Sequence, residues 1–318
     1  MLSPASVLSA AHRLRGIARR TPLRRSAGLS TRTSGSVFLK CECQQITGAF
    51  KLRGAFNTIA LLSEEERRKG VVTSSAGNHG MGLAWAARHF GVHATVFVPA
   101  TAPRVKRDGI AALGATVNAE AAHYDEALDM ATAFAAERGA THVHPERGDA
   151  LLAGQGTVAL EILEELPDLA AFVVPVGGAG LLGGCAALLD AVAPRVRIVG
   201  AQSDQTAAMA RSLAAGRIVP IPVAPTLADG LAGGIEETGF DTGRRVLDEM
   251  LTVTEEEIAG AIAWLWREEG LVVEGAGAVG VAALLSGYRP PVDGDVAVVL
   301  SGGNIDRERW EDIVARNS

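Results

Sequence analysis

Short runs of β-branched residues alternate along this chain with longer stretches of helical periodicity. We expect strands at Val37–Lys40, Val71–Ser74, Ala94–Val98, Thr116–Asn118, Phe172–Val176, Arg197–Ala201 and Val296–Leu300. We expect helices near residues 48–62, 79–90, 103–113, 123–138, 150–166, 181–192, 254–269 and 275–287. Because strands that alternate with helices form parallel sheets covered on both faces, the pattern predicts an α/β fold. Two domains are predicted, each an open, mostly parallel twisted sheet flanked by helices.

The two sheets are assigned to different parts of the chain. A smaller domain is expected from residues 48–145, and a larger one from residues 1–47 together with 146–318. The chain of 318 residues is long enough to bury two cores of this kind.

The N-terminal segment before Lys40 is rich in arginine and contains no acidic residue. This is the composition of an organelle transit peptide. We favour a structural helix over residues 4–19, ended by Thr21-Pro22, because proline disfavours helix in the residue before it.

Composition narrows the classes of partner. The net charge of -6 argues against binding to nucleic acid or to an anionic membrane surface, which requires a basic face. No apolar run approaches the roughly 20 residues of a membrane span. The three cysteines, Cys41, Cys43 and Cys185, form no even disulfide framework. Cys41 and Cys43 alternate on an expected strand, so we interpret them as packing thiols in a reducing, cytoplasmic compartment.

Three loops follow expected strands at the positions where parallel sheets bind ligands. These loops lie within "VVTSSAGNHG", "FVVPVGGAGLLGG" and "VAVVLSGGN". The second contains Gly178–Gly183, a GxGxxG string with Asp204 further on, and Gly275–Gly280 repeats the string. A dinucleotide site is the alternative that these strings raise. The first string predicts backbone N–H groups directed at a phosphate, and the second predicts close helix packing.

Lysine is scarce in this chain, in which arginine supplies most of the basic residues. Only Lys40, Lys51, Lys69 and Lys106 occur, and Lys51 stands in the small, apolar run "ITGAFKLRGA". An amine can lose its proton and attack a carbonyl, whereas a guanidinium effectively cannot. Lys51 is therefore a candidate catalytic amine. The ordinary alternative is a solvated lysine on the surface of a helix.

Six motifs occur together in one order over nearly the whole chain: "TGAFKLRGA", "SAGNHG", "GQGT", "PVGGAGLLGG", "ADG" and "SGGN". In this combination the chain resembles the fold-type II pyridoxal-phosphate enzymes, which share the tryptophan synthase β-like fold. It is most similar to the branch of threonine/serine dehydratases and serine racemases. The start "RTPL" also resembles that branch, which weakens the transit-peptide alternative. The resemblance implies pyridoxal 5'-phosphate as cofactor, a large domain that binds it, and a small domain that carries the substrate loop.

The resemblance also implies roles for individual residues. Lys51 would hold the cofactor covalently and then act as the base at the substrate Cα. Phe50 would pack beside the ring, and Asn78 would hydrogen-bond its phenolic oxygen. Ser301 would face the ring nitrogen, where a neutral hydroxyl suits expulsion of a β-substituent better than it suits a long-lived carbanion.

The phosphate would be held by main-chain N–H groups of Gly177, Gly178, Ala179, Gly180 and Leu181. The family's loop has glycine at the first four of these places, so Ala179 is a departure. We expect Ala179 to be tolerated only if it keeps a negative φ.

The substrate carboxylate would lie at the loop of Ser75, Ala76 and Gly77, with His79 as a further candidate. We favour a packing or capping role for His79, and a structural role for His144. In the similar racemases a serine that acts as the second acid/base stands where this chain has Ala76. This difference predicts elimination rather than racemisation.

The resemblance implies dehydration and deamination of L-threonine and L-serine to 2-oxobutanoate or pyruvate plus ammonia. The alternatives are another 3-hydroxy amino acid, a hydroxyectoine-derived compound, or a serine racemase. More remote are an NAD-dependent oxidoreductase and a binding protein without turnover.

Three expectations concern metal, length and assembly. Racemase relatives hold a divalent cation with two carboxylates, but the matching places here are Gln202 and Ala208, so no metal is expected, although Asp204 lies near. Only Ile305–Ser318 follow "SGGN", so we expect no C-terminal regulatory domain. A homodimer is expected from the family.

Overall fold

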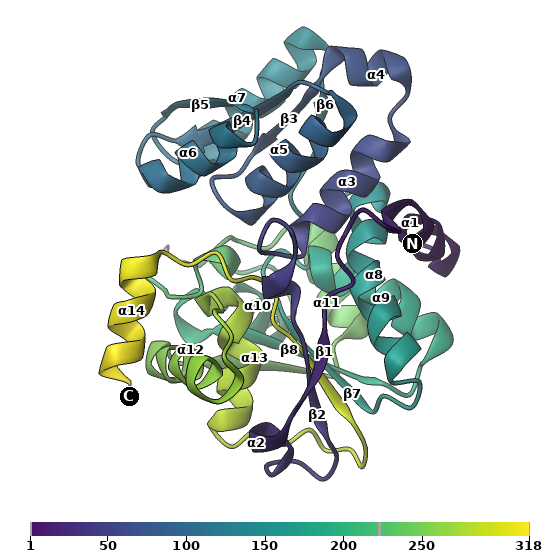
Figure 1. Cartoon of the computed structure of the whole chain (residues 1–318), viewed down its shortest axis with the longest axis vertical. Helices are drawn as coiled ribbons and strands as arrows, with labels where there is room; N and C mark the ends of the chain where they lie inside the picture. Colours follow the sequence, from purple (N-terminus) through teal and green to yellow (C-terminus); the bar gives the residue numbers. More distant parts are fainter. Residues whose placement is uncertain (1, 222–223, 318) are drawn as a thin grey trace.

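Two separate β-sheets organise the chain (Figure 1). The computed structural model describes residues 2–221 and 224–317. The larger sheet has the order β1-β2-β10-β7-β8-β9, and only its β1–β2 pair is antiparallel. Its strands are β1 (Leu23–Ser26), β2 (Val37–Lys40), β7 (Ala171–Pro175), β8 (Arg197–Ser203), β9 (Glu249–Val253) and β10 (Val296–Val299). The smaller sheet is parallel throughout, in the order β5-β4-β3-β6. Its strands are β3 (Val71–Ser74), β4 (Ala94–Pro99), β5 (Thr116–Ala121) and β6 (Thr141–His142).

Helices cover both faces of each sheet. One face of the larger sheet packs against α1 (Pro4–Leu14), α8 (Asp149–Glu165), α9 (Gly180–Val192), α10 (Ala208–Ala215) and α11 (Glu237–Val246). The other face packs against α2 (Ala27–Ser30), α12 (Glu255–Glu269), α13 (Gly275–Leu285) and α14 (Arg307–Arg316).

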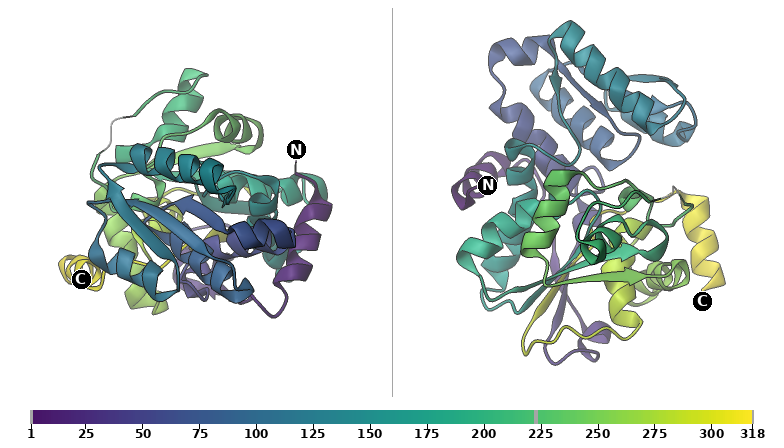
Figure 2. Two further views of the ribbon diagram at one scale, coloured as in Figure 1. Left: turned by 90° about the horizontal axis from the view of Figure 1, so that it is seen from above. Right: turned by 180° about the vertical axis from the view of Figure 1, so that it is seen from behind.

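The smaller sheet is enclosed in the same way. It is covered on one face by α3 (Lys51–Leu61), α5 (Asn78–Phe90) and α6 (Arg104–Ala112), and on the other by α7 (Tyr124–Arg138). The helix α4 (Glu64–Lys69) precedes β3, and short 3-10 turns occur at Glu42–Gln44, Asp204–Thr206 and Asp229–Leu231. The right view of Figure 2 shows the smaller unit against one end of the larger one. Within the described residues, no helix combines the length and the apolar character needed to cross a membrane.

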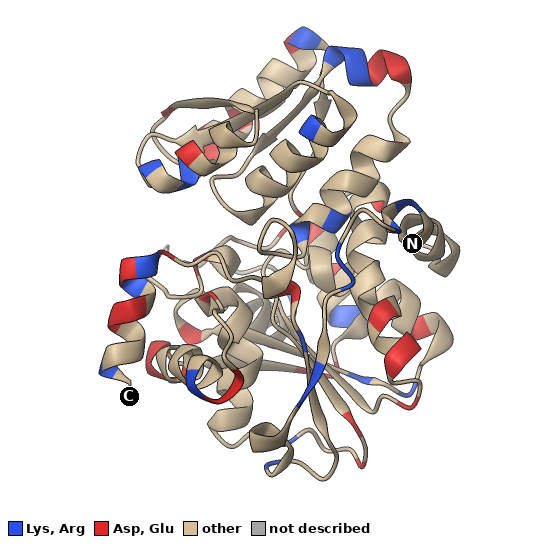
Figure 3. Cartoon of the chain, in the orientation of Figure 1, with Lys and Arg blue, Asp and Glu red and all other residues tan. Residues whose placement is uncertain are grey.

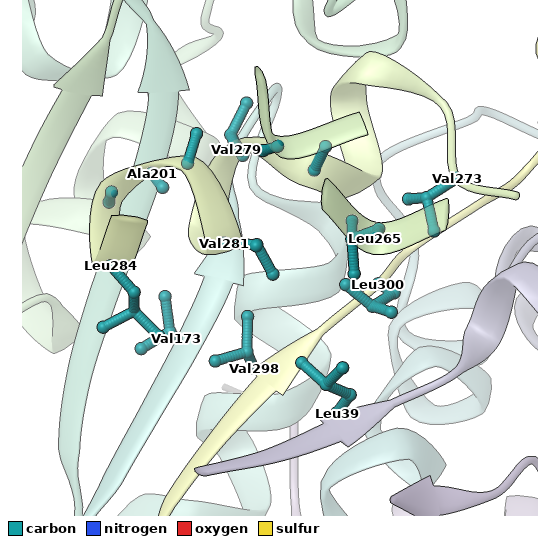
Figure 4. Packing of buried hydrophobic residues seen from close by; sticks show 14 of the residues in the cluster. Leu39, Val173, Ala201, Leu265, Val273, Val279, Val281, Leu284, Val298 and Leu300 are labelled. Carbon is teal, nitrogen blue, oxygen red and sulfur yellow. The ribbon is translucent and has the colours of Figure 1, made fainter. Parts of the chain in front are cut away.

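Alternating side chains explain why the central strands are buried on both sides. Phe172 and Val174 of β7 point into one core, whereas Val173 points into the other together with Val298 of β10 (Figure 4). Residues on a strand alternate between the two faces of the sheet, so a strand with helices on both faces must be apolar throughout. The observed strands and helices confirm the expected α/β fold and all seven expected strands.

Several elements differ from the expectation. The strands β1, β6 and β9 were not predicted, and neither were the helices α2, α4, α10, α11 and α14. The first helix ends at Leu14 rather than residue 19, and α3 begins at Lys51 rather than residue 48. Cys43 lies in a 3-10 turn and not on a strand, because β2 ends at Lys40. The expected domain boundaries stay a prediction, since α3 packs against both α5 and α8.

A buried ionic network joins the two units. The Arg53 guanidinium on α3 donates to Glu42 Oε1 at 2.7 Å and to Glu161 Oε1 of α8 at 2.6 Å. Lys40 Nζ donates to Glu161 Oε2 at 2.6 Å. Arg53 and Glu42 are 1% and 0% exposed, whereas most other charges in Figure 3 lie on the outer helices.

Charge pairing in this network outweighs the cost of burial. Burial acts to raise the pKa of Glu42, but Arg53 overcomes this effect and the net pKa is lowered. The resulting stabilisation is present above the ordinary carboxyl pKa and is lost as the pH falls through the lowered value.

Replacing Arg53 with methionine should therefore lower the free energy of unfolding by about 3–5 kcal/mol, because Glu42 loses its buried partner. Arg68→Met is the control, since the exposed Arg68 side chain contacts Glu64 through an ion pair at 3.7 Å and a hydrogen bond to its carbonyl at 3.3 Å, and its loss should be nearly neutral. Urea denaturation measures both variants. An Arg53→Met protein as stable as the control would contradict the assigned strength of the network.

Candidate active site

The start of α3 meets the loop after β10 and the segment before α8. Phe50 N donates to Ser301 O at 3.1 Å, and an isolated bridge pairs Ala49 with Gly302. Lys51 Nζ donates to Pro145 O at 2.7 Å. One of the three loops singled out in the sequence, the one that contains Ser301, therefore lies directly beside the start of α3.

Lys51 is the first residue of α3 and is partly buried. Burial lowers the pKa of its amine, and the carboxylates of Glu146 and Glu274 act in the opposite direction. Its Nζ lies 5.3 Å from the centre of the Phe50 ring, and Phe50 packs in one apolar cluster with Leu181. A lowered pKa increases the fraction of uncharged amine, which is the form that attacks carbonyl carbon.

Asn78 is the first residue of α5, and its side chain is hydrogen-bonded to residues of the larger unit. Its Nδ2 donates to Glu274 Oε1 at 2.7 Å, and its Oδ1 accepts from Asn304 Nδ2 at 2.7 Å. Burial and the nearby charge of Asp229 raise the pKa of Glu274 to about 7. Sequence reasoning did not single out Glu274, although it directly precedes the second GxGxxG string, and quoted Asn304 only as part of "SGGN".

The glycine loop joins β7 to α9 and has one unexpected conformation. Ala179 has φ = 71°, so the negative φ that its tolerance was expected to require is not found. The left-handed conformation turns successive N–H groups to one side of the loop, which favours an anion there. An alanine in this conformation costs about 1–2 kcal/mol.

The loop is already bonded to an anionic group. Gly178 N donates to Glu146 Oε1 at 3.2 Å, a contact that sequence reasoning missed because nothing in "HPERGD" indicates it. The opposite side of the loop is covered by the segment after "ADG", since a Cβ added to Gly177 would lie 3.4 Å from Leu231 Cα.

The loop at the start of α5 carries the residues expected to bind substrate. Ser75, Ala76 and Gly77 are partly buried, and Gly77 N donates to Ser75 Oγ at 3.3 Å. Open space surrounds the position of a Cβ on Gly77. His79 is 2% exposed, its Nε2 bonds Val143 O at 3.0 Å, and burial lowers its pKa to about 3. The packing role favoured for His79 fits this environment.

Ser301 follows β10 and is 4% exposed. Its hydroxyl forms no hydrogen bond to another residue in the described part of the chain. His144 Nδ1 accepts from Glu146 N at 3.2 Å, which agrees with a structural role for this histidine.

The residues considered for metal lie away from these loops. Gln202 Oε1 accepts from Ala210 N at 3.2 Å, and Ala208 is buried at the start of α10. Across the described ranges, no cluster of three or more His, Cys, Asp and Glu residues could hold a metal ion.

The other candidate features are structural or distant. Gly277 and Gly280 lie inside α13, where added Cβ atoms would approach Gly302 O at 2.8 Å and Val298 Cγ1 at 2.9 Å, so close helix packing is confirmed for the second GxGxxG string. A groove of about 840 Å³ opens beside β4 and α7, and it includes none of the expected site residues among those that line it.

Sequence comparison assigns the chain to a family. The profile of the family described as "Pyridoxal-phosphate dependent enzyme" matches residues 14–302. The chain belongs to this family of pyridoxal-phosphate-dependent enzymes.

Relatives of this pyridoxal-phosphate-dependent enzyme cover nearly its whole length. A Thermotoga maritima protein named L-threonine ammonia-lyase is 45% identical over 310 residues, or 96% of this chain and 76% of the relative. A Geobacter sulfurreducens protein of the same name is 43% identical over 319 residues, or 99% of this chain and 79% of the relative. Maize serine racemase superposes with a TM-score of 0.93 at 32% identity, covering 99% of this chain and 97% of that one. The expected fold-type II architecture is confirmed.

The residues of this pyridoxal-phosphate-dependent enzyme fit the cofactor. Its aldehyde requires an amine, which Lys51 offers at a partly buried position. The phosphate of the cofactor requires N–H donors. The bond from Gly178 N to the Glu146 carboxylate shows that the loop can donate to an anionic oxygen. Its ring nitrogen requires a polar neighbour, and the Ser301 hydroxyl has no other partner among the described residues.

The strain at Ala179 can be tested directly. Ala179→Gly should leave the free energy of unfolding unchanged or raise it by up to about 1 kcal/mol, because relief of the left-handed strain offsets the entropy of an added glycine. Ala133→Gly, at an exposed position inside α7, should lower it by about 1 kcal/mol. Thermal and urea unfolding compare the two variants, and equal losses would show that Ala179 is not strained.

Proposed function

We propose that this protein is an ammonia-lyase that dehydrates and deaminates L-threonine and L-serine, giving 2-oxobutanoate or pyruvate and ammonia. The proposal is supported by relatives at 45% and 43% identity that are named L-threonine ammonia-lyase. The observation that carries it is the position of the Lys51 amine beside the loop that contains the neutral Ser301.

Each residue then has a defined task. When bound, pyridoxal phosphate supplies an electron sink next to the substrate Cα. The N–H groups of the Gly177–Leu181 loop would hold the phosphate, and Asn78, bonded to Glu274 and Asn304, would orient the ring. The Lys51 amine would remove the Cα proton, and the β-hydroxyl would leave as water once it is protonated. Hydrolysis of the released enamine would then give the 2-oxo acid and ammonia.

The substrate carboxylate is assigned to the Ser75–Gly77 loop. Main-chain N–H groups at the start of a helix bind anions, and α5 presents such groups beside Ser75. Substrates with another 3-hydroxy side chain are the alternatives, because the residues that contact the side chain differ among such enzymes.

Racemisation is the second candidate, raised by the likeness to maize serine racemase. It requires a proton donor on the face opposite Lys51, and Ala76 offers only a methyl group there. We further propose a cytoplasmic homodimer; the location is supported by three free cysteines, and the assembly by the family resemblance alone.

Lys51→Ala should lower turnover of L-threonine by at least about 10³-fold, since it removes both the covalent attachment and the base. Lys69→Ala is the matched control on the exposed end of α4 and should retain wild-type activity. Coupled assays of 2-oxobutanoate and ammonia provide the measurement. A Lys51→Ala enzyme with a tenth of wild-type activity would refute the assignment.

Chiral chromatography tests the preference for elimination. The wild-type enzyme should form D-serine from L-serine at no more than about a hundredth of the rate of pyruvate formation. A general acid increases a reaction rate by about 10²–10⁴-fold, and the methyl group of Ala76 cannot act as one. Ala76→Ser should raise the D-serine share, and Ala76→Gly should not. Abundant D-serine from the wild-type enzyme would mean that another residue supplies the second acid/base.

A further inference from the structure

Glu146 places a carboxylate directly against the glycine loop. Its Oε1 accepts from Gly178 N at 3.2 Å. A Cβ built on Gly178 would lie 1.6 Å from Glu146 Oε2, so the carboxylate rests directly against this peptide. The main chain follows the same path, since a Cβ on Gly180 would lie 3.0 Å from Glu146 O.

Among the described residues no cation forms an ion pair with this carboxylate, although its charge acts to raise the pKa of the nearby Lys51 amine. Arg147, the next residue, forms its ion pair with Glu236 of the loop before α11, at 2.9 Å. The Lys51 amine donates instead to Pro145 O. Within the described residues Glu146 has no ion pair, and its side chain has one hydrogen bond, the one to Gly178.

The same N–H group is one that a cofactor phosphate needs. Gly178 lies between β7 and α9, where the left-handed Ala179 turns the loop toward an anion. One N–H group cannot form a full-strength hydrogen bond to a carboxylate and to a phosphate at the same time. Two anions on one loop also repel each other more strongly than they would in bulk water.

We propose that Glu146 is a resident anion of the cofactor loop, which holds the loop in its binding shape without cofactor and is displaced when phosphate binds. Displacement weakens the affinity for every phosphate-bearing form of the cofactor. The inference rests on the proposed cofactor-binding role of the loop.

The affinity of pyridoxamine 5'-phosphate tests this directly, because this compound has no aldehyde and its binding does not depend on a covalent bond to Lys51. Calorimetric titration of the cofactor-free protein should give a dissociation constant about tenfold lower for Glu146→Gln than for wild type. Glu137→Gln removes the same charge from the exposed end of α7 and should leave the constant within about twofold of wild type.

The melting temperature of the cofactor-free protein supplies a second readout. Glu146→Gln should lower it by roughly 2 °C, since the loop loses a charged partner, while the affinity rises. If Glu146 had a purely structural role, its replacement would lower both the melting temperature and the affinity for pyridoxamine 5'-phosphate. Glu146→Asp keeps the charge but shortens its reach to Gly178, and it should change both quantities in the same directions by a smaller amount.

The outcomes are distinct. Affinity in Glu146→Gln that is unchanged or weaker overturns the inference while leaving the proposed function intact. Failure of the wild-type protein to bind both pyridoxal 5'-phosphate and pyridoxamine 5'-phosphate would contradict the proposed function and overturn this inference with it.

Discussion

Arg53 lies two residues beyond Lys51 on the first turn of α3, and carboxylates from both sides hold its guanidinium. Glu42 reaches it from the turn after β2, and Glu161 reaches it from α8. The first turn of α3 has no side-chain cap at Phe50, and these ion pairs anchor it together with the bond from Phe50 N to Ser301 O. The amine of Lys51 is thereby brought to the loops of the larger unit.

The electrostatic setting around that amine follows from the same junction. Burial lowers the pKa of Lys51, while Glu146 and Glu274 limit the shift. Glu274 is itself buried and has a pKa near 7, so its charge depends on its contacts with Asn78 and Asn304. The site is therefore rich in acceptors, with Lys51 as the amine at its centre. If the ring nitrogen faces the neutral Ser301, as proposed, it has no acidic partner there.

The sequence predicts the buried parts of this structure better than its edges. Strands such as β7 were recognised because both faces need apolar residues. The strand β1 was missed because it is an edge strand that carries Arg24 and Arg25. The positive φ of Ala179 was not predicted from the sequence, since the shape of the loop, and not the residue type, determines it. Glu146 and Glu274 were missed because their partners lie 32 and 196 residues away in the chain.

The central claim is that the amine of Lys51, among four lysines, binds the cofactor aldehyde. Borohydride reduction of the protein incubated with pyridoxal 5'-phosphate, followed by mass mapping of peptides, tests it most directly. The account predicts one phosphopyridoxyl group per chain, on the peptide that contains Lys51, with Lys40, Lys69 and Lys106 unmodified. Label on any of those three with none on Lys51, or no stable label, would contradict it.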